Sequence, residues 1–232
     1  MRVQTRIIEH GLWPLTAVSF AGALVLLVYN TPVDPGAGSI QKMFYLHLPT
    51  AVAMLAMAMT VFVASLGYLW QKDPRWDDLA HAAGELTVLF GAVVLLTGMV
   101  WARGAWGHWW EWNAPLTFSL VLLVLYAGYV AIRPFVDRPG TRATVSALYG
   151  VAAFFDVPLI YVSLRLMPDR HASSVTLDPA MRLTLLVWFV PVSLLAFGLL
   201  RARFGLNTRV RLLEGPELGD SDRHASTNGV AP

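Results

Sequence analysis

The chain has no cysteine among its 232 residues, and charged residues make up only 14% of it. Without cysteine the protein has no disulfides, no thiol redox chemistry, no cysteine-ligated zinc or iron–sulfur cluster, and no C-x-x-C-H motif. Hydrophobic residues make up 56% of the chain, and the mean hydropathy is +0.55. A soluble domain of this size needs more polar surface, so the composition indicates an integral membrane protein.

Long apolar runs recur along the chain. A helix needs about 20 apolar residues to cross a bilayer. We therefore predict an all-α integral membrane protein with six transmembrane helices, at residues 12–29, 44–70, 86–102, 116–132, 146–166 and 183–200. Connections rich in proline, glycine and charge, such as "NTPVDPGAGS" and "RPFVDRPGTR", separate these runs.

The two ends of the chain differ from this pattern. Arg2 and Arg6 precede the first apolar run as in a signal peptide, but no small-residue cleavage site follows, so we expect the first span to be retained. From residue 201 the chain becomes polar and irregular. We predict a six-helix membrane domain over residues 1–200 and a polar, disordered cytoplasmic tail over residues 201–232.

The distribution of lysine and arginine predicts the orientation. With six spans both termini lie on one side, and that side carries 12 of the 17 basic residues. Positively charged residues stay in the cytoplasm, so we expect both termini to be cytoplasmic and the connection between spans three and four to be external. Without the C-terminal tail the count is seven to five, which is a much weaker bias.

That connection and its flanks hold the stretch "WARGAWGHWWEWNAPLT" (residues 101–117). Five of the nine tryptophans fall there: Trp101, Trp106, Trp109, Trp110 and Trp112. Tryptophan gathers at membrane interfaces, because its ring is apolar and its N–H group needs a polar partner. An interfacial belt is therefore one interpretation, and a platform for a large planar apolar ligand is the other. On a helix, residues 106, 109, 110 and 113 would share one face.

Four stretches together resemble a known family. "WGHWWEWNAPLT" is similar to the tryptophan-rich signature of the membrane proteins that handle haem during cytochrome c assembly. "MFYLHLPTAVAM", "VPLIYVSLR" and "RHASSVTLDPAMR" match, in the right order, the six-span branch of these proteins, the haem exporter protein C (cytochrome c maturation protein C) family. The resemblance covers residues 12–200. Asn113 and Pro115 depart from it, since the family has Asp and Arg there, so no role of a charged side chain carries over to these positions.

The resemblance implies a site for haem b, bound non-covalently and transiently. It places the family's two axial histidines at His47 and His171, and imidazole is a usual ligand of haem iron. The tryptophans would hold the haem face, with Asn113 beside them. Among the external basic residues Arg103 adjoins the tryptophans and is the first candidate for a haem propionate. The others, for which interfacial snorkelling is the alternative, are Lys42, Arg165, Arg170 and Arg182.

The remaining histidines receive no ligand role. We expect His10, His81 and His224 to be solvated on the cytoplasmic side, and no role is assigned to His108.

Asp156 is a carboxylate in the middle of the fifth span. At that depth it needs a partner, a polar cavity or a proton. Pro158 frees a backbone carbonyl nearby, so we expect a local polar pocket with Ser163 or Tyr161. The pocket would serve structural packing or a path for haem.

The resemblance also implies the function. We expect a multi-pass protein of the bacterial inner membrane that is not an enzyme: it binds haem at the periplasmic face and delivers it to a periplasmic haem chaperone for c-type cytochrome biogenesis. The other expected partners are ATP-binding-cassette transporter subunits, a small single-span assembly subunit and membrane lipid, with no nucleic acid. The chain itself has no P-loop, so ATP hydrolysis would lie elsewhere. The alternatives are a haem lyase or synthase, and a non-haem packing subunit of a transporter.

Overall fold

The computed structural model describes residues 2–33, 38–166 and 177–214, and within these ranges every regular element is a helix. The α-helices are α1 (Arg2–Val25), α2 (Phe44–Gln71), α3 (Pro74–Trp106), α4 (Ala114–Ile132), α5 (Pro139–Ala153), α6 (Asp156–Leu166) and α7 (Pro179–Glu214). Three short helical turns accompany them: η1 (Leu26–Asn30), η2 (Ser39–Met43) and η3 (Arg133–Phe135).

Six helical segments are long and apolar enough to cross a membrane. They are Gly11–Asn30, Ser39–Gln71, Pro74–Trp106, Ala114–Phe135, Pro139–Leu166 and Pro179–Leu213. The prediction of an all-α protein with six membrane-crossing helices is confirmed.

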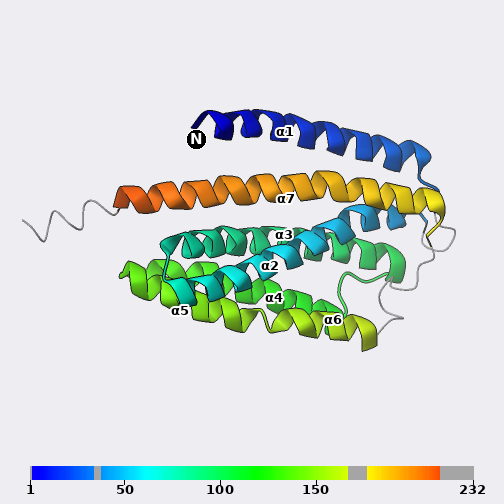
Figure 1. The fold of residues 1–232 in the computed structure, drawn as a ribbon. Helices are drawn as coiled ribbons and strands as arrows, with labels where there is room; N and C mark the ends of the chain where they lie inside the picture. Colours follow the sequence, from blue (N-terminus) through cyan, green and yellow to red (C-terminus); the bar gives the residue numbers. More distant parts are fainter. Residues whose placement is uncertain (1, 34–37, 167–176, 215–232) are drawn as a thin grey trace, which may run out of the picture.

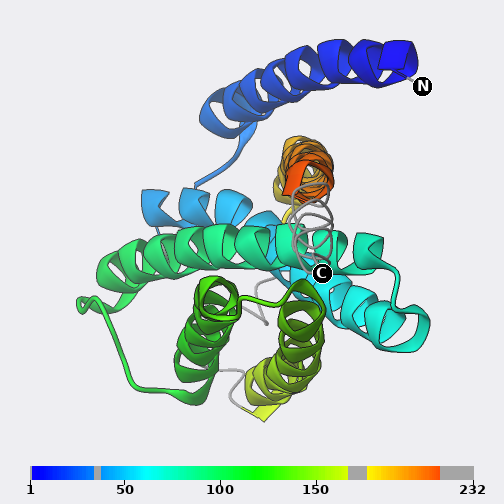
Figure 2. The same cartoon turned by 90° about the vertical axis from the view of Figure 1, so that its left-hand side faces the viewer.

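The helices run in the same general direction in the view of Figure 1, and the view of Figure 2 shows that α1 and α3 are tilted relative to α7, which is seen end-on there. The N-terminus, the α2–α3 connection and the last turns of α7 lie at one end of the bundle, which we call the termini end. The end of α3 and the start of α7 lie at the opposite end, which we call the tryptophan end. In the view of Figure 2, α7 lies between α1 and the other helices, and α1 packs mainly against α7.

The centre of the bundle is formed by α2, α3 and α4. Three large side chains of α4, Leu122, Tyr126 and Tyr129, are fully buried there. A Cβ atom at Gly84 of α3 would lie 2.6 Å from the ring of Tyr129, closer than real contacts allow. Glycine at this position therefore lets α4 approach α3, as small residues do between membrane helices.

The fifth span is interrupted in its middle. Helix α5 ends at Ala153 and α6 begins at Asp156, and i→i+3 hydrogen bonds, such as Val157 N–H to the Phe154 carbonyl at 3.0 Å, tighten the chain between them. Pro158 has no N–H to continue the regular helical pattern.

The polar pocket expected around Asp156 is not found among the described residues. Ser163 Oγ donates instead to the Ile160 carbonyl at 2.7 Å, and Tyr161 faces outward and accepts from Arg165 at 2.8 Å. The local carbonyl competes successfully for the serine hydroxyl, which is common inside helices. Asp156 is buried, and its Oδ2 has no hydrogen-bond partner in the part of the chain that the structure describes.

Helix α7 corrects the predicted end of the membrane domain. The polar tail was expected to begin at residue 201, but the helix continues to Glu214. Its 36 residues span about 54 Å, well beyond a hydrocarbon core of about 30 Å. Arg203, Asn207 and Arg211 recur every four residues and so share one helix face, which contacts α3. Residues 215–232, including His224, lie outside the described residues.

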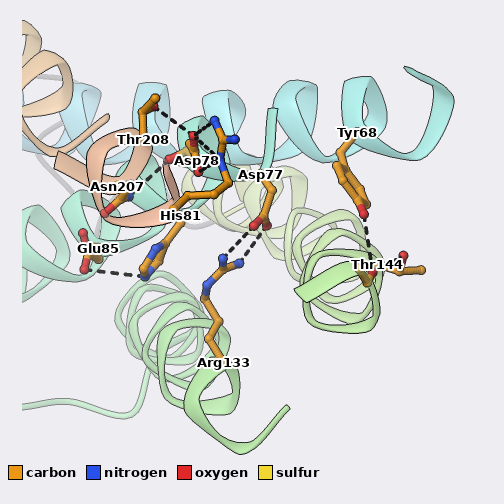
Figure 3. A network of polar contacts seen from close by, with 11 residues as sticks. Tyr68, Asp77, Asp78, His81, Glu85, Arg133, Thr144, Asn207 and Thr208 are labelled. Atoms are coloured by element: carbon orange, nitrogen blue, oxygen red, sulfur yellow. Dashed lines mark hydrogen bonds and ion pairs between the residues drawn. The ribbon is translucent and has the colours of Figure 1, made fainter. Parts of the chain in front are cut away.

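Carboxylates of α3 hold this extension of α7. Arg211 Nη2 donates to Asp78 Oδ2 at 2.8 Å, and Thr208 Oγ1 donates to the same oxygen at 2.9 Å (Figure 3). Arg203 Nε donates to Glu85 Oε2 at 2.7 Å. The pairs 78–211 and 85–203 show that α3 and α7 run antiparallel in register.

Helix α3 begins at Pro74 and takes up most of the predicted cytoplasmic loop, so His81 is part of the helix. It follows Asp78 by three residues and precedes Glu85 by four, and therefore lies on the same face of α3. Its Nε2 lies 3.6 Å from Glu85 Oε1 (Figure 3). The expectation that His81 is simply solvated is wrong, since its side chain is only 24% exposed.

Candidate functional site

Trp101, Trp106, Trp109, Trp110 and Trp112, which we call the tryptophan cluster, lie at the end of α3 and in the connection that follows it. Gly107 has φ +82°, a left-handed conformation that glycine adopts without steric cost, and its N–H donates to the Arg103 carbonyl at 3.2 Å. Glycine in this position ends helices frequently. Residues 107–113 are not helical. Residues 106, 109, 110 and 113 therefore do not share one helical face, and the dipeptide "WG" is the signal that indicates the break.

Asn113 begins the next helix. It is the N-cap of α4, and its side-chain oxygen accepts from the Leu116 N–H at 3.0 Å. Asp caps helices by the same hydrogen bond, so the change from the family's Asp keeps this local function. Pro115 lies in the first turn of α4, where its missing N–H costs nothing. These two departures are thus compatible with the fold of the connection.

The tryptophans form two edge-to-face pairs rather than one flat wall. Trp101 and Trp106, both on α3, have ring centroids 5.1 Å apart at 77°, and Trp110 and Trp112 of the connection are 5.5 Å apart at 77°. Such pairs are the geometry that aromatic quadrupoles prefer. Trp109 and Trp112 remain 55% and 76% exposed, so their rings are accessible at the tryptophan end.

Arg103 braces this connection. Its guanidinium lies 6.0 Å from the centre of the Trp109 ring and also donates to the Gly107 carbonyl. Arg103 thus has a cation–π contact with the tryptophan cluster. The other candidate arginines have different contacts: Arg165 lies over the ring of Tyr161, and Arg182 donates to the Leu177 carbonyl. Lys42 lies 3.5 Å from the Val28 carbonyl, and Arg170 lies outside the described residues.

His47 stands in the first turn of α2, at the tryptophan end, and is half-buried. Its Nδ1 lies 2.9 Å from Oγ1 of Thr97 on α3. Trp101 follows Thr97 by four residues and so occupies the same face of α3 one turn further on. The contact between α2 and α3 therefore brings an imidazole to the edge of the tryptophan cluster. His171, the second predicted ligand, lies outside the described residues.

The sequence pattern alone does not single out Thr97 or the adjacent Gly98. A polar residue followed by glycine within the apolar run "VVLLTGMVW" is the available signal. It indicates a side chain that can form a hydrogen bond next to a position where another helix can come close. It does not indicate the partner, His47, which is 50 residues away in the sequence.

These features define a class. The chain is a multi-pass membrane protein whose helix bundle carries, at one end, a cluster of tryptophans with an arginine and a histidine at its edge.

The family follows from comparison with known proteins. Residues 1–214 match the family described as heme exporter protein C, and the chain belongs to that family. Heme exporter protein C of Escherichia coli strain K12 is 35% identical over 185 residues, which cover 73% of this chain and 74% of that protein. The protein of the same description from Bradyrhizobium diazoefficiens is 32% identical over 193 residues, covering 79% and 73%. The family match ends at the same residue as α7, which supports including residues 201–214 in the domain.

Proposed function

We propose that this protein binds haem at the tryptophan end of its bundle and passes it on during the biogenesis of c-type cytochromes. The observation that carries the proposal is the contact of His47 on α2 with Thr97 of α3, which lies one helical turn before Trp101, at the end of the bundle where Trp109 and Trp112 are exposed. Membership of the heme exporter protein C family supports haem as the cargo.

The side chains fit the chemistry of haem. Its conjugated face suits exposed indole rings, its iron suits an imidazole nitrogen, and its propionates suit a guanidinium. Trp109 and Trp112 supply the rings, His47 the imidazole and Arg103 the guanidinium. Trp110 adds a buried Nε1 donor with no hydrogen-bond partner among the described residues, as expected of a group that a polar ligand edge satisfies.

Haem bound here is held without a covalent bond to cysteine, since the chain has none. The proposed role is binding, orientation and release, and not catalysis. A haem lyase or synthase is the alternative: formation of thioether bonds on an apocytochrome by this protein alone would contradict the proposal.

We further propose that the tryptophan end faces the periplasm. The six-span topology assigns 12 of the 17 basic residues in the sequence to the side of the termini, and the positive-inside rule predicts that this side is cytoplasmic. A periplasmic haem chaperone would receive the haem. The other partners would be ATP-binding-cassette subunits, a small single-span subunit and membrane lipid. Haem exporters of this family are named for export, and the energy for that would come from a partner because the chain lacks a P-loop.

The orientation is tested by cysteine labelling, for which the cysteine-free chain is well suited. His108 at the tryptophan end and Gln71 at the termini end are both exposed. In intact spheroplasts we expect a membrane-impermeant maleimide to label His108→Cys, and to label Gln71→Cys only after permeabilisation. The reverse pattern would place the tryptophans in the cytoplasm and refute the orientation.

The tryptophan platform is tested with a double variant. Removing both exposed rings, in Trp109→Leu/Trp112→Leu, should cost about 1 kcal/mol of stacking per ring and so raise the Kd for haem about 30-fold. Haem titration of the purified protein, followed by absorbance, measures this. Trp70→Leu is the matched control, because Trp70 is 88% exposed but lies at the termini end. Equal losses in both proteins would indicate an interfacial belt rather than a platform.

A further inference from the structure

Thr97 makes the contact that fixes how His47 is held. The Thr97 side chain is buried in the α2–α3 interface, and its Oγ1 lies 2.9 Å from His47 Nδ1. This hydrogen bond joins residues 50 positions apart in the sequence, so it depends on the packing of the two helices and not on local structure.

The direction of the hydrogen bond follows from the other neighbours of Thr97. Oγ1 lies 2.8 Å from the Val93 carbonyl oxygen and 3.1 Å from the Val94 carbonyl oxygen. Carbonyl oxygens can only accept, and a threonine hydroxyl has a single proton, so this proton goes to the α3 backbone. The oxygen then accepts from His47, whose Nδ1 must carry the proton. In the neutral imidazole the lone pair is consequently on Nε2.

Gly98 restricts the same ring from a second position. A Cβ atom at Gly98 would lie 3.3 Å from His47 Cε1 and 3.9 Å from Nδ1, which is tighter than ordinary van der Waals contact for the first atom. The backbone of α3 therefore approaches the imidazole where a side chain would push it away. Thr97 therefore holds the ring by a hydrogen bond, and Gly98 leaves the space that the ring needs beside α3.

We propose that Thr97, assisted by Gly98, is a positioning residue that sets the tautomer and the orientation of His47, so that Nε2 is the nitrogen that binds haem iron. The inference rests on the proposed function and deepens it. In metal sites the second ring nitrogen of a ligating histidine usually donates to such an acceptor, which raises the basicity of the ligand. Loss of the acceptor typically costs 10- to 100-fold in metal affinity.

The test uses the full-length protein, purified in detergent and titrated with haem. In Thr97→Val the shape of the side chain is kept and the acceptor is lost, so the Kd for haem should rise about tenfold. The midpoint potential of the bound haem should also rise, because a less basic imidazole stabilises ferric iron less well. Thr97→Ser keeps the hydroxyl and should restore both values to near those of the wild type. Gly98→Ala should weaken binding with Thr97 intact.

The outcomes separate two failures. If the wild type binds haem and His47→Ala does not, but Thr97→Val has the wild-type Kd and midpoint potential, the inference is overturned and the proposed function stands. If Thr97→Ser loses haem as Thr97→Val does, the effect is one of packing and the inference is also overturned. If the wild type shows no haem binding, the proposed function itself fails, and the inference with it. Size-exclusion profiles and helical circular dichroism report folding, and Thr97→Ala replaces Thr97→Val if the latter does not fold.

Discussion

Replacing His47 with alanine is expected to raise the Kd for haem by about 100-fold, because the iron loses a ligand rather than a group that only orients one. His47 lies at the tryptophan end, where Thr97 holds its ring beside the face of α3 that carries Trp101. The variant keeps the indole rings, so residual haem should bind weakly by stacking. Absorbance titration of the purified protein, together with the haem content of protein from haem-replete cells, measures the change.

His81→Ala is the control for this experiment. His81 is also a half-buried helix residue, but it lies at the termini end, beside Glu85. Its removal should leave haem content unchanged, whereas His171→Ala should weaken haem retention if His171 is the second ligand. Equal haem content in the His47, His171 and His81 variants would defeat the assignment of both ligands.

The second large effect is expected in stability. Arg133 forms two hydrogen bonds of 2.8 Å with the carboxylate of Asp77, and the two side chains are only 9% and 14% exposed (Figure 3). Arg133→Ala leaves that buried carboxylate unpaired, which typically costs about 3–5 kcal/mol. In a protein of this size we expect the apparent Tm in detergent to fall by about 10 °C. Thermal unfolding followed by circular dichroism measures it.

Two further variants show whether the loss arises from an unpaired charge. Asp77→Leu/Arg133→Leu removes both charges, so it should recover most of the lost stability. Arg203→Ala breaks a more exposed ion pair, with 40% of the arginine side chain accessible, and should lower Tm much less. A double variant as unstable as Arg133→Ala, or an unchanged Tm in the single variant, would contradict this account of the pair.

The six spans could be predicted because hydropathy depends on composition alone. The same reasoning ended the sixth span at residue 200, where the apolar run ends. The helix continues because Arg203 and Arg211 find Glu85 and Asp78 on α3, more than 115 residues away in sequence. Such pairing depends on the register between two helices, and a hydropathy profile carries no information about that register. The polar spacing of four residues in α7 is the one local sign.

In the candidate site, too, some features could be predicted from the sequence and others depend on how the helices pack. Composition located the tryptophan cluster, and the resemblance directed attention to His47. The turn at Gly107, which takes Trp109 and Trp112 off the helix, depends on a backbone conformation that the aromatic pattern hides. The contact between Thr97 and His47 depends on how α2 and α3 pack, so neither residue's neighbours in the sequence reveal it.

The absorption spectrum of the wild-type protein, purified from haem-replete cells, tests the central claim most directly. If the indole rings and His47 hold haem at the tryptophan end, the spectrum shows a Soret band that His47→Ala largely removes. A wild-type protein that is folded and lacks a Soret band, even after haem is added in excess, would contradict the claim that this site binds haem.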